Sequence, residues 1–427
     1  MKTILLVPTE IGVGLTSACL GLIYALECQG IKAGFLKPFS QELQPEADRT
    51  TALYRHLFKH ETVEPITYAA LTERLKNDEN DELLEDAVRL HREISKHHDI
   101  IIVEGVLPNG RDPFATELNA NLAKALDAKV IIVSNADINN PVKTASKVDN
   151  QFRFFGGASG ERTAGVLFMR TKGLPDGSAQ IPVTLDPNLR LISDTNQFVS
   201  KIQTTHPMIG KDCMPVIGLV PFSNTLSVPR MSDLAAHISA EWINQGEAAQ
   251  RRVLHSSLIA SNIEHEMHKF VAGELIISGS DRVDVLLASS LASSNGIPLA
   301  GLVLTEQKAP SAQALEFCQA AIKNGLPILH TKLSTFETAQ QLLNLSNEIP
   351  VDDTERAEQV TRFVASHINQ EWLSHLISDS YKPRLSPSAF RHELVQKSIA
   401  AKKRIVLPEG DEPRTVQAAA ICQSRGI

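Results

Sequence analysis

Short apolar runs alternate with longer segments at helical spacing from the start of the chain to about residue 245. The runs are rich in Val, Ile and Leu and are bounded by turn residues, which is typical of strands covered on both faces. This alternation predicts an α/β fold with a parallel sheet, whose ligands bind outside the carboxyl ends of the strands. The expected strands are Ile4–Val7, Ala33–Leu36, Ile100–Val103, Val130–Val133, Gly165–Phe168 and Val216–Val220.

A charged, weakly apolar stretch at residues 244–252 indicates the end of a first domain, for which we expect residues 1–245. A second, smaller α/β pattern occupies residues 253–367. Its expected strands are Glu274–Ile277, Leu299–Leu304 and Leu326–His330. Each of these ranges is long enough to bury a core of its own.

The last part of the sequence begins with residues 378–388, which contain two prolines among polar residues and are predicted to be a linker. Residues 389–427 then suggest a helix at Phe390–Lys403, a strand at Arg404–Leu407 and a helix that starts at Pro413. A strand with a single crossover helix cannot bury its faces until later strands pair with it. We therefore expect residues 389–427 to be the truncated start of a third α/β domain.

Charge and composition limit the kinds of molecule that this chain is expected to bind. The net charge is −7 and the pI is near 6.1, so no positive field would attract nucleic acid or an anionic membrane. No apolar run approaches the roughly 20 residues needed to span a bilayer. The 5 cysteines show no Cys-x-x-Cys spacing, which fits a reducing compartment. We expect a cytoplasmic protein that binds small-molecule metabolites, and neither nucleic acid nor a membrane.

The stretch Pro8–Ser17 joins the first expected strand to a long apolar helix. A glycine-containing turn at such a place points backbone N–H groups at one position, where the helix dipole also favours an anion. In the P-loop pattern G-x-x-x-x-G-K-[ST], the lysine contacts the terminal phosphates and the hydroxyl contacts magnesium. Here Thr9 replaces the first glycine and Leu15 replaces the lysine, which argues against ATP hydrolysis. The candidate anion- or nucleotide-binding residues of this loop are Thr9, Gly12, Gly14, Thr16 and Ser17, and the alternative is an ordinary strand-to-helix turn.

Two further polar residues follow the next strands along the chain. Lys37 precedes a proline after the second expected strand, and Glu104 precedes a glycine after the third. With the loop, this layout resembles the dethiobiotin-synthase-like branch of P-loop proteins. The resemblance implies that Lys37 contacts phosphate and that Asp48 and Glu104 are carboxylates on the metal side; the alternative is a surface lysine and a loop carboxylate. Where nucleotide-binding relatives commonly carry an Asn, this chain has Phe168–Arg170, so an ATP-specific pocket is not expected.

In the second domain, Ser278–Val285 follows an expected strand and leads into an apolar helix. Its Asp281-Arg282 pair resembles the signature of the DRTGG domain, a small module found beside regulatory or catalytic domains of metabolic enzymes. The next strand of that domain typically leads into Thr-Gly-Gly, whereas Thr305–Gln307 here lacks both glycines. The alternative interpretation makes Asp281 a helix N-cap and Arg282 an exposed neighbour.

The most specific resemblance lies in the last part of the chain. Phe390–Leu394 and Lys403–Thr415 closely resemble the entry to the catalytic domain of phosphate acetyltransferases. These enzymes interconvert acetyl-CoA plus phosphate with acetyl phosphate plus CoA. Val351–Arg356 and Leu385–Pro387 also resemble the joining region of the long-form enzymes, so the resemblance covers essentially the whole chain in the expected order.

This resemblance implies that the chain carries the non-catalytic, regulatory and assembly portion of a phosphate acetyltransferase. The acetyl-transfer groups of the family lie beyond the entry segment, so we assign no catalytic residue here and expect no acetyltransferase activity from this chain. CoA and acetyl-CoA are then substrates of the complete enzyme, which is expected to be a homo-oligomer. No cofactor is assigned, and the candidate ligand of the front domains is a nucleotide or metabolite effector.

Two other functions fit parts of the pattern. An ATP-dependent ligase of the dethiobiotin-synthase type is suggested by the loop, Lys37 and Glu104, but Leu15 cannot offset developing phosphate charge. A ligand-free interaction scaffold is the second alternative.

Overall fold

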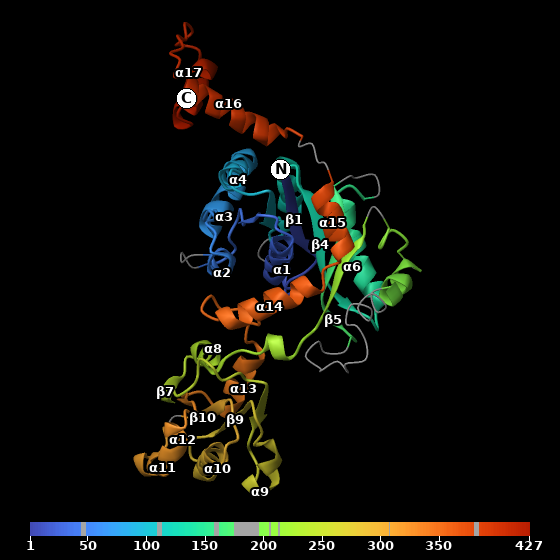
Figure 1. Cartoon of the computed structure of the whole chain (residues 1–427). Coiled ribbons are helices and arrows are strands. Elements are labelled where there is room, and N and C mark those ends of the chain that lie inside the picture. Colours follow the sequence, from blue (N-terminus) through green and yellow to red (C-terminus); the bar gives the residue numbers. More distant parts are fainter. Residues whose placement is uncertain are drawn as a thin grey trace. The chain divides into compact units, whose positions relative to one another are not determined.

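The computed structural model describes residues 1–43, 48–108, 113–157, 162–174, 196–204, 206–211, 214–306, 308–379 and 384–427. The chain divides into two compact units, which are treated separately below (Figure 1). The first unit combines Met1–Phe222 with Val351–Ile427, and the second unit is Ser223–Pro350.

The first unit contains a parallel sheet with the strand order β2-β3-β1-β4-β5-β6. All the strands expected in this region are present, and the α/β class with a parallel sheet is confirmed. Their apolar runs are buried because helices cover both faces of a sheet of this kind. The strands are β1 (Lys2–Pro8), β2 (Ala33–Leu36), β3 (Ile100–Glu104), β4 (Lys129–Asp137), β5 (Thr163–Lys172) and β6 (Val216–Pro221).

The helices of this unit turn one apolar stripe toward the sheet. In α4, buried residues recur at the three- and four-residue spacing of a helix face, at Leu83, Ala87, Leu90 and Ile94. They join one core with Leu5 and other strand residues. In the described residues, the helices that precede β5 are α1 (Leu15–Cys28), α2 (Arg49–Phe58), α3 (Tyr68–Lys76), α4 (Asn80–Ser95), α5 (Ala115–Ala125) and α6 (Pro141–Phe154).

His91 lies on the buried face of α4, with its Nε2 atom 2.8 Å from the Thr3 hydroxyl of β1. Burial, followed by the nearby Arg92 and N-terminal charges, lowers the pKa of His91 to about 4. A lowered folded-state pKa means that stability is fully present above the unfolded value near 6.5 and is lost as the pH falls toward 4. Between pH 7.5 and 5, we expect His91 alone to reduce the free energy of unfolding by about 2 kcal/mol.

Denaturant unfolding of the chain and of His91→Gln at these two pH values measures this difference. Gln keeps a polar partner for Thr3 but does not titrate, so its pH dependence should be shallower by the amount given. Equal pH dependence in both proteins would contradict the assignment.

The segment after residue 350 returns to the first unit. On α14 (Thr354–Ser366), Val364 faces Gly21 of α1 so closely that a Cβ at Gly21 would lie 2.4 Å from the Val364 Cγ1 atom. The backbone N–H of Asn369 then donates to the carbonyl oxygen of Ile217 in β6 at 2.7 Å. The next helix, α15 (Gln370–Ser378), places the Trp372 indole N–H 3.2 Å from the Ala164 carbonyl oxygen. Residues 354–378 therefore complete this unit.

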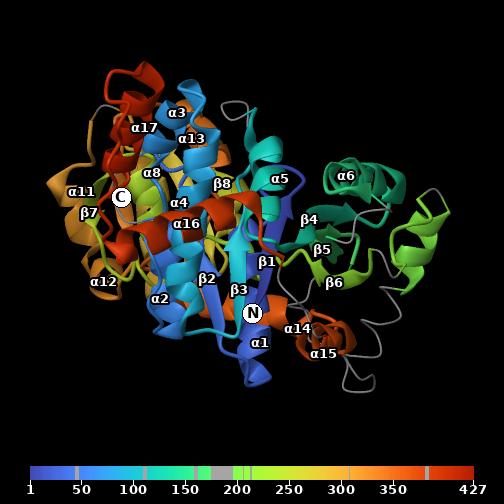
Figure 2. The same ribbon diagram turned by 90° about the horizontal axis from the view of Figure 1, so that it is seen from above.

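The chain continues into α16 (Pro387–Ala401) and α17 (Pro413–Ser424). Part of the predicted linker, residues 380–383, lies outside the described residues, and Pro387 is the first residue of α16. Figure 2 shows α16 alongside α4, where Arg391 forms an ion pair with Glu85 at 2.7 Å.

The strand expected at Arg404–Leu407 is wrong, because this segment is irregular. Ile405 and Val406 are 74% and 81% exposed, and no described strand pairs with them. An apolar run forms a strand only where a partner satisfies its backbone N–H and C=O groups.

The second unit has a sheet with the order β7-β11-β10-β9-β8, in which β7 is antiparallel to β11 and the other pairs are parallel. Alternate residues of β9 and β10 enter two cores, so Ile276 and Leu302 face one layer of helices while Leu275 and Val303 face the other. The strands are β7 (Glu241–Asn244), β8 (His255–Leu258), β9 (Glu274–Gly279), β10 (Gly301–Thr305) and β11 (Ile328–His330).

The helices around this sheet are α8 (Met231–His237), α9 (Ile263–Glu266), α10 (Val283–Ser294), α11 (Ala312–Phe317), α12 (Gln319–Lys323) and α13 (Thr335–Leu343), with short 3₁₀ turns at Thr225–Ser227 and Met267–Lys269. The second unit thus starts earlier and ends earlier than the expected range 253–367. The difference arises because β7 pairs with β11, whereas α14 packs on α1.

Within the described parts of the chain, no helix is both long enough and apolar enough to cross a membrane.

Candidate functional site

The loop between β1 and α1 is a glycine-containing turn that leads directly into a helix. Gly12 and Gly14 have φ angles of +75° and +80°, a conformation that glycine adopts without a steric penalty. Gly14 is the N-cap of α1, which has neither a side-chain cap nor an acidic residue in its first turn. Its Leu15 side chain is only 4% exposed, so it packs in the core. The loop therefore offers backbone N–H groups and a helix terminus, without the P-loop lysine.

The structure brings most of the predicted polar residues of the first unit together. Because β2, β3 and β1 are neighbours, residues at their carboxyl ends meet at one edge of the sheet. Lys37 Nζ lies 2.7 Å from an Asp48 carboxylate oxygen and 3.3 Å from a Glu104 oxygen. A hydroxyl chain extends from Glu104 through Thr50, at 3.2 Å, to Thr16 of α1, at 3.1 Å.

Asp48 also caps a helix. Its carboxylate accepts from the backbone N–H and the hydroxyl of Thr51, both at 3.1 Å, at the start of α2, and from the Ser40 hydroxyl at 3.1 Å. Burial alone would raise the pKa of Asp48, but the Lys37 charge and these hydrogen bonds outweigh it and lower the pKa. Asp48 is therefore an ionised, fully bonded member of the cluster.

For Glu104, burial outweighs the nearby positive charge, so its pKa is raised. Burial raises its pKa, and the charge of Lys37 offsets only part of that increase, while the neighbouring Asp48 carboxylate adds to it. Its Oε2 atom is buried and has no hydrogen-bond partner among the described residues. Lys37 keeps its ammonium because Glu104 and Asp48 outweigh the burial that would lower its pKa. One cation is thus shared by two buried carboxylates.

Other predicted residues of the loop have different partners. Thr9 donates its backbone N–H to the Val133 carbonyl oxygen at 2.9 Å and its hydroxyl to Ser134 at 3.0 Å, so it is bonded to β4 rather than facing an anion. The Ser17 side chain lies in the first turn of α1 and makes no hydrogen bond with the residues that the structure describes. Over the described ranges, no group of three or more His, Cys, Asp or Glu residues could hold a metal ion, although Asp48 and Glu104 lie close together.

Sequence reasoning missed the role of Arg170, which lies within β5 at the place where nucleotide-binding relatives commonly carry an Asn. Its guanidinium donates to the Gly12 carbonyl oxygen at 3.1 Å and lies 5.5 Å from the centre of the Phe222 ring. Burial lowers the pKa of Arg170, and its φ angle of +49° is unusual for a residue with a side chain. A cation of β5 thus reaches the loop that follows β1, although β4 lies between these two strands in the sheet.

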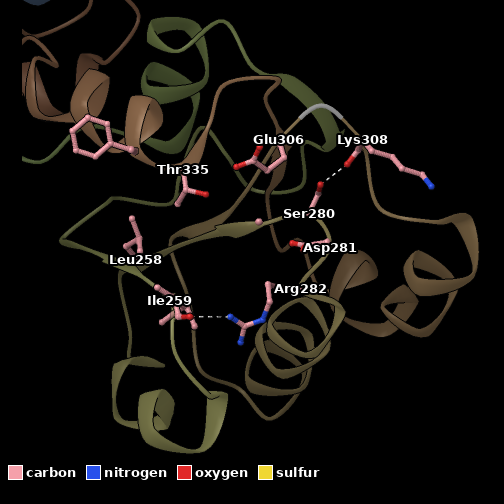
Figure 3. A pocket seen from close by; sticks show the side chains of 11 residues that line it. Leu258, Ile259, Ser280, Asp281, Arg282, Glu306, Lys308 and Thr335 are labelled. Atoms are coloured by element: carbon pink, nitrogen blue, oxygen red, sulfur yellow. Dashed lines mark hydrogen bonds between the residues drawn. The ribbon is translucent and has the colours of Figure 1, made fainter.

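The second unit has a cavity of about 810 Å³ at the carboxyl ends of β8, β9 and β10, beside the start of α13 (Figure 3). This position is where a parallel sheet binds ligands, and the volume is in the range of small-molecule sites. The predicted Asp281 and Arg282 both line it. The full lining is Leu258, Ile259, Ala260, Gly279, Ser280, Asp281, Arg282, Glu306, Lys308, Thr335 and Phe336.

The alternative that made Asp281 a helix N-cap is wrong, since α10 begins one residue later, with Arg282 at the N-cap and no side-chain cap. The Arg282 guanidinium is held by hydrogen bonds and is not a free cation. It makes two hydrogen bonds to the Asp284 carboxylate, at 2.7 and 2.9 Å, and one to the Ser261 carbonyl oxygen at 2.9 Å. These contacts tie the loop after β8 to the start of α10.

Glu306 takes a glycine-like conformation at the position where the DRTGG pattern has its first glycine. Its φ angle is +83°, and a hydrogen bond from its N–H to the Leu333 carbonyl oxygen, at 2.9 Å, helps to hold it there. The His330 Nε2 atom lies 2.9 Å from the Glu306 carbonyl oxygen. A left-handed backbone at a residue with a side chain costs roughly 1–2 kcal/mol.

Glu306→Gly is therefore expected to raise the free energy of unfolding by about 1 kcal/mol, measured by denaturant unfolding. Glu316→Gly, an exposed helical position of α11, should have the opposite sign and cost up to about 1 kcal/mol. A loss of stability in both variants would show that Glu306 is not strained.

Comparison with known families assigns both units. The family model for an AAA domain matches residues 2–230, which is more than half of the chain. The chain belongs to this AAA domain family. A DRTGG domain model matches residues 233–345 downstream of the AAA domain, which confirms the resemblance seen at Asp281 and Arg282.

Curated relatives of the whole chain, AAA domain included, are phosphate acetyltransferases. The enzyme of Acinetobacter baylyi is 67% identical over 427 residues, and that of Pseudomonas aeruginosa is 39% identical over 431 residues. Each comparison covers 100% of this chain but 59% of the relative, so the chain spans less than two thirds of their length.

Solved structures show weak similarity to parts of this chain. A Cyanothece McdA–ATP complex matches 52% of this chain and 84% of its own, at 13% identity and a TM-score of 0.31. The CBS and DRTGG domains of a Clostridium perfringens pyrophosphatase, complexed with the activator diadenosine tetraphosphate, match 30% of this chain and 50% of their own, at 18% identity and a TM-score of 0.24.

Proposed function

We propose that this chain is the regulatory and assembly portion of a phosphate acetyltransferase, the enzyme that interconverts acetyl-CoA and phosphate with acetyl phosphate and CoA. The 67% identity to the Acinetobacter baylyi enzyme across all 427 residues carries the proposal. Residues 389–427 are proposed to begin the catalytic domain, whose reactive groups lie in the part of the relatives that this chain does not span. The complete protein is proposed to be a cytoplasmic homo-oligomer.

The first unit supports a binding role better than phosphoryl chemistry. A P-loop enzyme offsets charge on the terminal phosphates with its lysine, but Leu15 is buried at that position. Lys37 lies between two carboxylates instead. We propose that Gly12, Gly14 and the first turn of α1 form an anion site, with Lys37, Asp48 and Glu104 as the charged cluster beneath it.

A coupled assay tests the main proposal. The 427-residue chain should form no acetyl-CoA from acetyl phosphate and CoA, while the complete Acinetobacter baylyi enzyme, as the positive control, should turn over. Turnover by the chain itself would refute the division of roles. MgATP hydrolysis by the chain would instead favour the ligase alternative.

A further inference from the structure

We propose that the cavity of the second unit binds the nucleoside part of an effector, with the base against apolar side chains and the ribose hydroxyls on Asp281 and Glu306. The inference deepens the proposed regulatory function by naming the class of effector. The inference rests on that function only for the effect of binding on the complete enzyme. Binding itself can be measured with this chain alone.

Two carboxylates, those of Asp281 and Glu306, line the cavity. In Figure 3, Asp281 and Glu306 lie on neighbouring loops at the ends of β9 and β10. Neither carboxylate has an ion-pair partner within 4.0 Å in the part of the chain that the structure describes. Carboxylates at the ends of parallel strands accept hydrogen bonds from ribose hydroxyls in dinucleotide-binding folds, where the donor needs no charge.

Arg282 and both nearby helix starts are already bonded, and Lys308 points away, which disfavours a phosphate as the part of the ligand held here. Arg282 is bound by Asp284, and the Lys308 side chain extends away from Asp281 and Glu306 (Figure 3). The Asp284 carboxylate accepts from backbone N–H groups at the start of α10, and Ser334 and Glu337 form a capping box on α13. Neither helix start is therefore open to an anion.

Apolar side chains supply the surface for a base. Leu258 and Phe336 both line the cavity and are 39% and 76% exposed. When a planar ring covers large apolar side chains that are exposed to water, the buried apolar area makes binding favourable. Ile259, only 2% exposed, continues this surface into the core.

The conformation of Glu306 adds an independent argument. Strained backbone persists where the surrounding structure fixes it and is concentrated at ligand clamps. The contacts of Glu306 with Leu333 and His330 fix its backbone. Its side chain therefore projects from a rigid position beside the cavity.

Isothermal titration calorimetry of the 427-residue chain with adenosine and uridine tests the proposal. We expect at least one of them to bind, and its 2′,3′-dideoxy analogue to bind at least tenfold more weakly. Asp281→Asn and Glu306→Gly should each weaken binding about tenfold or more, whereas Glu316→Gln, an exposed carboxylate outside the cavity, should not.

Glu306→Gly separates binding from folding, because it is expected to unfold at higher denaturant concentration while losing affinity. No heat with either nucleoside would overturn the proposal, as would equal affinity for the dideoxy analogue or binding of inorganic phosphate alone to the cavity. These results leave the acetyl-transfer assay untouched, so a failure here and a failure of the proposed function are distinguishable.

Discussion

Replacing Lys37 with methionine is expected to lower the free energy of unfolding by about 3–5 kcal/mol. The Asp48 and Glu104 side chains are only 1% and 5% exposed, and Lys37 is the cation that both of them contact. Methionine fills a similar volume but leaves two carboxylates buried beside each other. Denaturant unfolding at neutral pH measures the loss.

The double variant Lys37→Met/Glu104→Gln is the matched control for this prediction. It removes one of the two carboxylates together with the cation, so it should recover part of the stability. The deficit of the single variant should also shrink as the pH falls, because protonation removes the uncompensated charges. A small loss in Lys37→Met that does not vary with pH would show that the cluster does not depend on its ammonium.

Gly21→Leu is expected to cost about 3 kcal/mol, at the upper end for overpacking of a core. A Cβ at this position already lies 2.4 Å from the Cγ1 atom and 2.6 Å from the Cβ atom of Val364, and backbone of α14 follows at 3.4 Å. The helices can make room only by separating. The helical preference of leucine over glycine offsets no more than about 1 kcal/mol of this cost.

Two further variants, measured by denaturant unfolding, test whether contact with α14 causes the loss of stability in Gly21→Leu. Gly410→Leu should change stability by less than about 0.5 kcal/mol, because a Cβ at Gly410 meets nothing within 4 Å. Adding Val364→Ala to Gly21→Leu should restore part of the loss. An undiminished loss in that double variant would mean that α14 is not the source of the clash.

The parallel sheet could be predicted because its strands are runs of Val, Ile and Leu, which can be recognised from the local sequence alone. The strands β7 and β8 were missed, since Glu241–Asn244 and His255–Leu258 are short and largely polar. Their strand character comes from neighbouring strands that supply hydrogen bonds. The reverse error at Arg404–Leu407 has the same origin, because an apolar run without a pairing strand stays irregular.

The candidate site was predicted in part. The order of Lys37 and Glu104 along the chain indicated one sheet edge, and the structure places both there with Asp48. The sharing of one ammonium by two carboxylates could not be predicted, because it depends on strand order and side-chain distances. The approach of Arg170 to the loop and the conformation of Glu306 likewise depend on contacts between segments far apart in sequence.

The covering of α1 by α14 has a consequence for synthesis on the ribosome. The patch around Gly21 is made early, but residues 354–366 that cover it emerge only after the whole of Ser223–Pro350. Because chains are made from the N-terminus and domains fold as units, the inserted unit can mature before its host is finished. During that interval the nascent host carries an uncovered apolar helix face, and surface of this kind favours aggregation until α14 covers it.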